Sequence, residues 1–363
     1  MIRTAHGNLL EAPVEALVNT VNCVGVMGKG IALQFKQAFP ANYKAYEAAC
    51  NANMVAPGRM LVHDHGMLIH PRYVINFPTK RHWRGDSRME DIETGLTALV
   101  EEVRERGIRS IAVPPLGCGL GGLDWAEVRP KIEAAFTALP DVEVLLYEPS
   151  GAPAAKAMPV RTEKPKMTAS RALFIKLMES YEALDYSRTL LEVQKLAYFL
   201  QAAGEPLRLK YEPGIYGPYA HNLNKVLEAM EGHYVRGYGD SQRPDAEIEL
   251  LPDAVEAAEA YLDVDSDSRR RLERVVALIE GFETPYGMEL LATVHWAGVH
   301  GGREGGAPAR DAAQAVAIVH AWNPRKQRIL KPRHVATAWD RLTSLGWLDT
   351  PSNIKRAQST TLL

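Results

Sequence analysis

The sequence has few cysteines, no long apolar run and no excess of charge of either sign. Its three cysteines, Cys23, Cys50 and Cys118, are widely spaced and form no CxxC pair, which argues against a disulfide framework and against a zinc site. No apolar stretch approaches the roughly 20 residues needed to cross a bilayer, and the first residues lack a signal-peptide pattern. We therefore expect a cytoplasmic protein without a membrane segment, a metal or another cofactor.

The net charge is close to zero, because 42 Lys and Arg residues face 44 Asp and Glu residues. Such a chain has no global field that attracts nucleic acid, so any contact with DNA must be local or made through a modified base. The sequence does not show the aromatic-basic platform typical of single-strand binders. With 363 residues, 46% of them hydrophobic, the chain is long enough for two domains that each bury a core.

The first 150 residues alternate short β-branched runs with amphipathic helical segments. This alternation predicts an α/β domain, residues 1–152, in which a mixed or largely parallel sheet lies between helices. The expected strands are 16–21, 67–70, 73–77, 108–113 and 142–147. The expected helices are 30–39, ended by Pro40, then 89–106 and 126–139, the last with Asp124 as its N-cap.

The second half has a different composition. Residues 153–168 combine prolines, small residues and charges, which is typical of a linker. Residues 169–363 predict a mainly helical α+β domain. Its expected helices are 172–184, 190–203, 221–230, 253–261 and 268–281, and its expected strands are 208–211 and 248–251. Residues 240–267 hold ten acidic residues and one basic residue, and such a run is either a solvated face or a binding surface.

Two glycine-rich loops follow predicted strands, and each precedes a helix. The first is 23–31, directly after Asn22, and the second is 114–123. In such loops glycines let the backbone approach a phosphate, N–H groups donate to its oxygens, and the helix N-terminus favours negative charge. Neither loop is a Walker A motif or a dinucleotide-binding GxGxxG in its proper context. Tight turns are the alternative for either loop alone, whereas two loops at one sheet edge can enclose a diphosphate.

Taken together, these segments resemble the macrodomain family. The matching segments are 6–10, 16–22, 28–32 and 115–122, so the resemblance covers about residues 1–150. It implies a mixed sheet between helices and a cleft for ADP-ribose. Residues 76–80, which end in a lysine, are similar to the branch that cleaves ADP-ribose from acidic residues. They are also similar to the DarG family of bacterial antitoxins, which removes ADP-ribose from thymine in DNA after a DarT-like ADP-ribosyltransferase toxin has attached it.

The resemblance implies a role for each matching residue. Asn8 and Leu9 would lie near the adenine, and Asn22 would contact the distal ribose. Thr79 would also bind ADP-ribose, and Lys80 would be the catalytic residue at the distal ribose. The two loops would hold the diphosphate and the distal ribose through Gly28, Lys29, Gly30, Ile31, Gly117, Cys118, Gly119, Leu120, Gly121 and Gly122.

Two positions depart from the family pattern. Asn8 stands where many macrodomains carry an Asp that accepts a hydrogen bond from the adenine amino group. Gly121 stands where the lysine-dependent relatives carry an Asp that acts together with the lysine. A fully shared mechanism therefore does not follow from the resemblance.

Lys80 can act chemically in two ways. A neutral lysine would attack C1 of the distal ribose, whereas a charged one would stabilise negative charge on the departing base. The cations that follow, Arg81, His82 and Arg84, favour the neutral amine. An ordinary surface lysine, or one that only holds phosphate, is the alternative.

Residues 63–65 and Cys118 are not predicted to have a catalytic or metal-binding role. We interpret 63–65, His-Asp-His, as a turn and not as a metal site, because alternate residues of a strand face opposite ways. Cys118 has no His partner placed to activate it, so we expect a small packing residue.

The second domain resembles, over about forty residues, the Panacea-type antitoxin domain. The matching segments are 191–199, 211–219 and 223–227. This resemblance implies a module that binds a partner toxin. The sequence therefore predicts an antitoxin that removes ADP-ribose from thymine in DNA and also captures its cognate transferase. The alternatives are an ADP-ribose reader, a glycohydrolase acting on protein carboxylate esters, and a regulatory protein whose helical domain binds nucleic acid.

Overall fold

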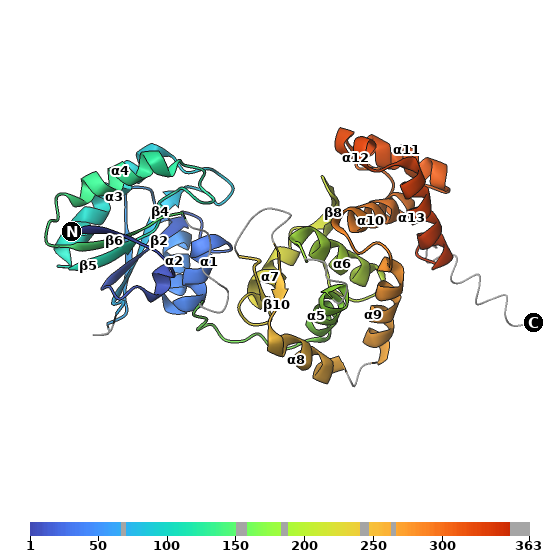
Figure 1. Ribbon diagram of the computed structural model, residues 1–363, viewed down its shortest axis with the longest axis horizontal. Helices are drawn as coiled ribbons and strands as arrows, with labels where there is room; N and C mark the ends of the chain where they lie inside the picture. The colour runs from blue at the N-terminus through green and yellow to red at the C-terminus, as the bar shows by residue number, and fades with distance from the viewer. Residues whose placement is uncertain (67–69, 150–157, 183–187, 240–246, 263–265, 349–363) are drawn as a thin grey trace, which may run out of the picture. The chain divides into compact units, whose positions relative to one another are not determined.

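The computed structural model describes residues 1–66, 70–149, 158–182, 188–239, 247–262 and 266–348 (Figure 1). The chain divides into two compact units: Met1–Lys164 with Gly239–Gln242, and Pro165–Tyr238 with Arg243–Leu363. Among the helices of the described ranges, none is both long and apolar enough to cross a membrane.

A six-stranded mixed sheet forms the centre of the first unit. Its strand order is β1-β6-β5-β2-β4-β3, and neighbouring strands are parallel except for β3 against β4. The strands are β1 (Ile2–Ala5), β2 (Ala16–Asn22), β3 (Leu61–Asp64), β4 (Tyr73–Lys80), β5 (Ser110–Val113) and β6 (Glu143–Tyr147). Because β2, β4 and β5 run in parallel, the loops that follow them leave the same edge of the sheet.

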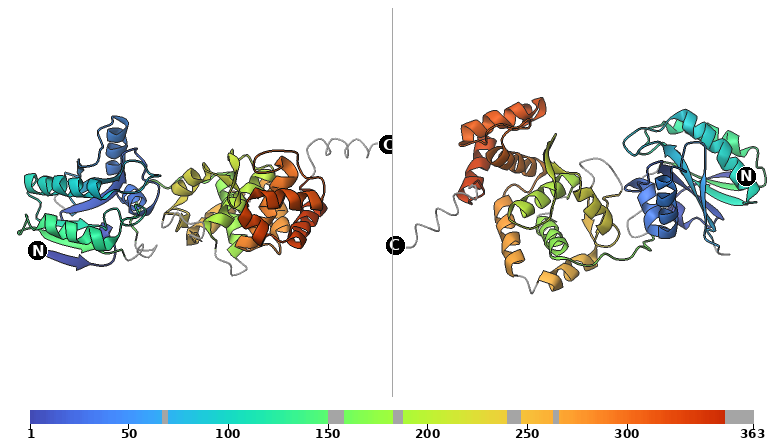
Figure 2. Two further views of the ribbon diagram at one scale, coloured as in Figure 1. Left: turned by 90° about the horizontal axis from the view of Figure 1, so that it is seen from above. Right: turned by 180° about the vertical axis from the view of Figure 1, so that it is seen from behind.

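Helices cover both faces of this sheet (Figures 1 and 2). The short η1 (Leu9–Glu11), α1 (Gly30–Ala38) and α2 (Pro40–Asn51) lie on one face, and α3 (Met89–Glu105) and α4 (Trp125–Phe136) lie on the other. Alternation along β2 explains the layers, because Val18 packs with Ile92 of α3 whereas Leu17 packs with Phe35 of α1. The expected α/β domain with a mixed sheet between helices is confirmed.

Most elements of the first unit match their predictions. The expected strands 16–21, 73–77, 108–113 and 142–147 correspond to β2, β4, β5 and β6. Of the fifth expected strand, 67–70, residues 67–69 lie outside the described residues. The expected helices correspond to α1, α3 and α4, with shifts of one to three residues at their ends. Asp124 caps α4 as predicted, since its side chain accepts from the Ala126 N–H at 2.9 Å.

Four elements of the first unit were not predicted: β1, β3, α2 and the short η1. β1 and β3 are four-residue edge strands, too short for an alternating pattern to be recognised. The helical region does not stop at Pro40, which begins α2, because the first position of a helix needs no N–H. The interpretation of His63 and Asp64 as a turn is wrong, since both lie in β3, paired with β4.

Part of the segment expected to be a linker packs on the first unit. Residues 153–157 lie outside the described residues. Met158 packs against the core beneath α1, and the Arg161 N–H donates to the Gln37 carbonyl at 2.8 Å. The division between the two units falls after Lys164.

The second unit is mainly helical, as expected. Its helices are α5 (Ala169–Glu182), α6 (Leu190–Ala202), α7 (Leu223–Met230), α8 (Pro252–Leu262), α9 (Ser266–Ile279), α10 (Pro285–His300), α11 (Ala312–Trp322), α12 (Pro324–Ile329) and α13 (Pro332–Ser344). Two antiparallel pairs complete it: β7 (Tyr211–Gly214) with β8 (Gly217–Ala220), and β9 (Val235–Arg236) with β10 (Glu249–Leu250). α6 and α10 are buried on nearly all sides, which is typical of central helices.

The five expected helices of this unit correspond to α5–α9, and α10–α13 had no individual prediction. The expected strand 208–211 is wrong except at Tyr211, where β7 begins, because Arg208 adopts a left-handed φ of 56°. The expected strand 248–251 contains β10.

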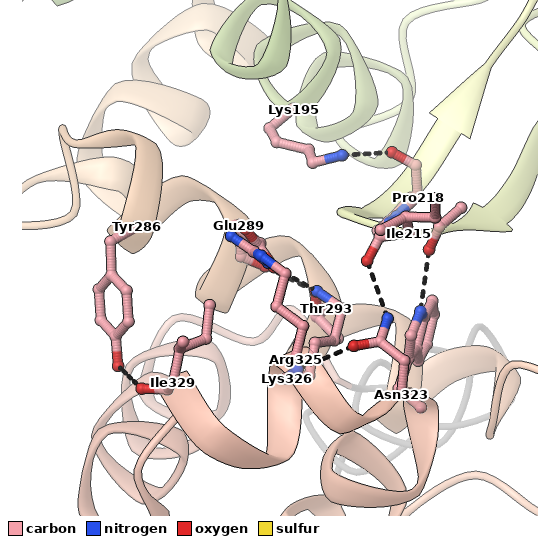
Figure 3. A network of polar contacts seen from close by, with 12 residues as sticks. Lys195, Ile215, Pro218, Tyr286, Glu289, Thr293, Asn323, Arg325, Lys326 and Ile329 are labelled. Atoms are coloured by element: carbon pink, nitrogen blue, oxygen red, sulfur yellow. Dashed lines mark hydrogen bonds and ion pairs between the residues drawn. The ribbon is translucent and has the colours of Figure 1, made fainter. Parts of the chain in front are cut away.

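The β7–β8 hairpin is held by polar side chains from helices on both sides (Figure 3). Lys195 of α6, which is fully buried, donates to the Pro218 carbonyl at 2.7 Å. The Asn323 side chain donates to the Ile215 carbonyl at 3.1 Å, on the turn of the hairpin. The segments that resemble the Panacea-type domain, α6 and the hairpin, therefore contact each other directly.

A buried ion cluster lies beside the hairpin. The Glu289 carboxylate of α10 accepts from Lys326 at 2.7 Å and from Arg325 at 2.6 Å, and Lys326 also donates to the Thr293 hydroxyl at 3.0 Å. Burial lowers the pKa of Lys195 to about 7; the charge of Lys326 adds to this effect and Glu289 opposes it. The cluster stabilises the packing of α12 on α10 because the Glu289 carboxylate neutralises the buried charge of Lys326; without that carboxylate the buried charge would be destabilising.

Candidate active site

The residues predicted to act on a ligand gather at the carboxyl edge of the sheet. Asn22 is the last residue of β2 and Lys80 is the last residue of β4. A shift of register after Val21 makes these two residues direct partners across the neighbouring strands. The second glycine-rich loop leaves the next strand, β5, at the same edge.

The side chain of Asn22 shapes the first loop. Its Oδ1 accepts from the N–H groups of Val24 at 3.0 Å and Val26 at 3.3 Å, and its Nδ2 donates to the Val26 carbonyl at 2.5 Å. From α2, the hydroxyl of fully buried Tyr46 lies 2.7 Å from the Asn22 carbonyl and 3.1 Å from its Oδ1. The amide of Asn22 is thus engaged within the loop, and its contact with a ribose stays a prediction.

The first loop ends at the N-terminus of α1. Lys29 is the N-cap residue without a side-chain cap, and Gly30 opens the helix with a φ of +59°. The first N–H groups of a helix favour a bound anion, and Gly28 and Ile31 flank this point. A Cβ on Gly30 would lie 3.5 Å from Cδ1 of Leu120, so the two glycine-rich loops meet here.

The second loop packs tightly against Ser87. Gly117 and Gly122 have φ angles of +72° and +78°, which favour glycine. The Ser87 N–H donates to the Gly121 carbonyl at 2.9 Å. A Cβ on Gly121 would lie 2.3 Å from both the Gly117 carbonyl oxygen and Ser87 Oγ, whereas a Cβ on Gly119 would meet no atom within 4 Å. This backbone therefore has no room for the aspartate that lysine-dependent relatives carry at the position of Gly121.

Lys80 joins β4 to the second loop. Its ammonium group donates to the carbonyl of Leu120. Burial lowers the pKa of Lys80, and the charge of Asp86 opposes this shift. The sequence attributed a lowered pKa to the cations that follow, but Arg81 is paired with the buried carboxylate of Asp91 at 3.0 and 3.2 Å. Burial, and not the charge of the following residues, favours the neutral amine.

Thr79 and Cys118, two other predicted site residues at this edge of the sheet, have side chains that point into the protein interior. Thr79 is buried, and its hydroxyl lies 3.5 Å from the Val21 carbonyl. Cys118 packs against the core beside α3 and α4, and burial raises the pKa of its thiol to about 11. The thiol is therefore protonated at neutral pH, which agrees with the expected packing role.

Asn8 and Leu9 build the start of η1. The Asn8 Oδ1 accepts from the Leu10 N–H at 3.1 Å, so this side chain caps the turn. The side chain of Leu9 packs in the core with Leu17 and Phe35. A contact of Leu9 with an adenine would therefore use its backbone, and both roles stay predictions.

Two residues of this region were missed from the sequence. Tyr46 went unnoticed together with α2, although a proline at the first helical position was a usable signal. Ser87 carries no signal of its own, because its contact with Gly117 and Gly121 arises only in the folded chain. Within the described part of the chain, no three His, Cys, Asp or Glu side chains are placed to hold a metal ion.

The fold and the two loops define the first unit as a macrodomain, and the Macro domain family model matches residues 18–132. The whole chain is 49% identical over 360 residues to a DNA ADP-ribosyl glycohydrolase of Thermus aquaticus, covering 98% of each chain. It is 36% identical over 159 residues to a DNA ADP-ribosyl transferase-DNA ADP-ribosyl glycohydrolase fusion protein of Thermosipho africanus, covering 40% of this chain and 41% of that one. The solved macrodomain of Thermus aquaticus DarG is 62% identical and covers 41% of this chain and 99% of that chain, with a TM-score of 0.40. The chain belongs to the family of DNA ADP-ribosyl glycohydrolases.

Proposed function

We propose that this chain is an antitoxin that hydrolyses ADP-ribose from thymine in DNA and also binds and neutralises its cognate ADP-ribosyltransferase. The observation that carries the first activity is the position of Lys80 beside Asn22 and against the second glycine-rich loop. The relatives' activity on ADP-ribosylated DNA supports DNA as the substrate.

Binding of ADP-ribose follows from the two loops. The N-terminus of α1 and the second glycine-rich loop lie at one edge of the sheet, where a diphosphate would be held. Within that loop the N–H groups of Cys118 and Gly122 already donate to loop carbonyls, so the remaining amides would bind the phosphates. Because Lys80 contacts Leu120 of the same loop, the ribose next to the diphosphate would lie beside its amine.

Hydrolysis breaks the bond between C1 of the distal ribose and the base, and water supplies the hydroxyl that ends on C1. Lys80 either attacks C1 first as a neutral amine, or remains charged and stabilises the departing base. The two roles need opposite protonation states of Lys80, so they have opposite pH profiles, and the lowered pKa of Lys80 moves both profiles to lower pH. Attack by the amine makes kcat rise as pH rises through the pKa of Lys80, whereas the electrostatic role makes kcat fall over the same range.

The substrate is tested with the full chain on two modified molecules of matched concentration. We expect turnover of a single-stranded oligonucleotide carrying ADP-ribosyl-thymine, and much slower turnover of a protein carrying ADP-ribose on carboxylate esters. Faster release from the protein would make the chain a protein ADP-ribosyl glycohydrolase. Tight binding of ADP-ribose without any turnover would make it a reader.

Binding of the transferase would use the second unit. The Thermosipho africanus relative carries a transferase and a glycohydrolase in one chain, which supports association of the two proteins. In the acidic run, Glu247, Glu249 and Asp253 are exposed, whereas Asp245 lies outside the described residues. An enzyme that modifies DNA must hold phosphates with Lys and Arg, and closely spaced carboxylates would fit that groove.

The full chain with Lys80→Ala separates capture from hydrolysis. We expect this variant to bind the purified transferase and still lower its rate of DNA modification. Neutralising Glu247, Glu249 and Asp253 together should then weaken binding and flatten its salt dependence. A Lys80→Ala chain that leaves the transferase fully active would contradict capture, and unchanged affinity of the triple variant would remove the acidic run from the interface.

A further inference from the structure

The loop that follows Lys80, residues 81–88, is attached to the candidate active site at both ends. It begins directly after Lys80, whose ammonium group contacts Leu120 of the second glycine-rich loop. Near its other end, the Ser87 N–H donates to the Gly121 carbonyl of that same glycine-rich loop at 2.9 Å. A ligand that binds to the 81–88 loop would therefore lie close to Lys80.

The base of the 81–88 loop is fixed by buried partners. Arg81 forms two hydrogen bonds with Asp91, a residue that is 5% exposed in the first turn of α3. Between Arg81 and Ser87 the chain makes a turn, in which the Gly85 N–H donates to the His82 carbonyl at 3.1 Å. The Arg84 N–H also donates to Nδ1 of His82 at 3.2 Å.

This turn presents a stack of three exposed side chains. The rings of His82 and Trp83 have centroids 5.5 Å apart and an interplanar angle of 28°. Cζ of Arg84 lies 4.6 Å from the centroid of the Trp83 ring. Trp83 is 39% exposed, and an aromatic ring with adjacent cations on a short turn is the combination that binds nucleobases and phosphates in single strands. The sequence alone did not suggest this platform.

The charge of the 81–88 loop also favours DNA. The chain as a whole has a net charge of −2, whereas this loop has three arginines and one aspartate. Arg81 is paired with Asp91, so Arg84 and Arg88 are the cations that remain for a phosphate. This local positive surface beside Lys80 can attract DNA phosphates, whereas the chain as a whole, with its net charge near zero, does not.

We infer that the 81–88 loop is the DNA-contacting surface of this enzyme, on which a nucleotide next to the modified base extends the His82–Trp83–Arg84 stack and a backbone phosphate pairs with Arg84. The inference rests on the proposed function, in which the modified base leaves the site beside Lys80. The occupant is single-stranded DNA, because an unpaired neighbouring base is needed to reach the ring of Trp83.

The test compares two substrates that share the same modified base. One is ADP-ribosyl-thymidine, which has no flanking nucleotide, and the other is a single-stranded ten-nucleotide DNA with one modified thymine. The full chain is assayed with Trp83→Ala, Trp83→Phe and Arg84→Ala. The control is Arg109→Ala, which removes an exposed cation directly before β5, at the opposite edge of the sheet.

We expect Trp83→Ala to raise KM for the oligonucleotide on the order of 10-fold, since stacking on one aromatic ring has about this effect. Its kcat, its KM for ADP-ribosyl-thymidine and its affinity for ADP-ribose should stay within about twofold of the parent. Trp83→Phe should recover most of the loss. Arg84→Ala should flatten the salt dependence of oligonucleotide KM by about 0.7 log units per log unit of salt, the share of one phosphate. Arg109→Ala should change none of these values.

An unchanged oligonucleotide KM in Trp83→Ala overturns the inference, and so does an equal rise for oligonucleotide and nucleoside. An equal rise of KM for an ADP-ribosylated peptide in Trp83→Ala would show that Trp83 contacts any substrate and not DNA in particular, and this result would also overturn the inference. If the parent chain turns over the modified oligonucleotide while the variants behave like the parent, only the inference fails. If the parent chain turns over neither DNA substrate, the proposed function fails.

Discussion

Gly121→Ala is the smallest change that tests how the second glycine-rich loop works. The new Cβ would lie 2.3 Å from the Gly117 carbonyl oxygen and 2.3 Å from Ser87 Oγ. One of these two atoms belongs to the backbone of the same loop, so rotation of a side chain cannot relieve the contact. Overpacking of this kind costs about 1–3 kcal/mol, which corresponds to roughly 5- to 150-fold in an equilibrium constant.

The cost should appear in the affinity for ADP-ribose, because the loop must shift and its N–H groups move with it. Calorimetry with free ADP-ribose measures the effect, and kcat on modified DNA measures whether the loop still positions the substrate. Gly119→Ala is the matched comparison and should lose far less, since its Cβ meets no atom within 4 Å.

The same geometry predicts that Gly121→Asp does not restore the aspartate of lysine-dependent relatives. We expect Gly121→Asp to lose at least as much affinity as Gly121→Ala, because it adds the same Cβ and a charge beside the bound diphosphate. Gly121→Ala that binds ADP-ribose as tightly as Gly119→Ala, or Gly121→Asp that hydrolyses faster than the parent, would refute this account of the loop.

Three further changes test separate parts of the structure. Gly119→Glu should abolish binding of ADP-ribose, because a bulky anion enters a loop that holds a diphosphate, and calorimetry showing parental affinity would remove this loop from the site. Tyr46→Phe should lower stability by about 1–3 kcal/mol and weaken ADP-ribose binding, since it leaves the buried Asn22 carbonyl without its hydroxyl donor; denaturant unfolding and calorimetry should change together. Glu289→Ala should destabilise the second unit by about 3–5 kcal/mol, because Lys326 and Arg325 lose their shared carboxylate, and an unchanged melting transition would contradict the role of this cluster.

The sequence predicted the parts of the fold that depend on local pattern. β2 and β4 are rich in apolar and β-branched residues, and the loops after Asn22 and Val113 contain their own glycines, so both the strands and the loops could be located. β3 was not located, because a four-residue edge strand has too few residues for a pattern and its pairing with β4 is set by the fold.

The details of the candidate site depend on contacts between distant segments, which a sequence pattern does not contain. The match to macrodomains suggested Lys80 and Gly121, but only the folded chain brings Ser87 against Gly121 and closes that position to any side chain. Burial of Lys80 likewise depends on the second loop, whereas the sequence suggested only the charges that follow it. Tyr46 reaches Asn22 from α2, a helix that the sequence pattern did not predict, because Pro40 indicated only the end of the preceding helix.

The measurement that tests the central claim most directly is the turnover of ADP-ribosylated DNA by Lys80→Ala, made alongside its affinity for free ADP-ribose. Lys44→Ala, which removes an exposed lysine of α2, is the control. We expect Lys80→Ala to lose on the order of 100-fold or more in kcat while it keeps most of its affinity for ADP-ribose. A Lys80→Ala chain that releases ADP-ribose from DNA at the parental rate would contradict the account.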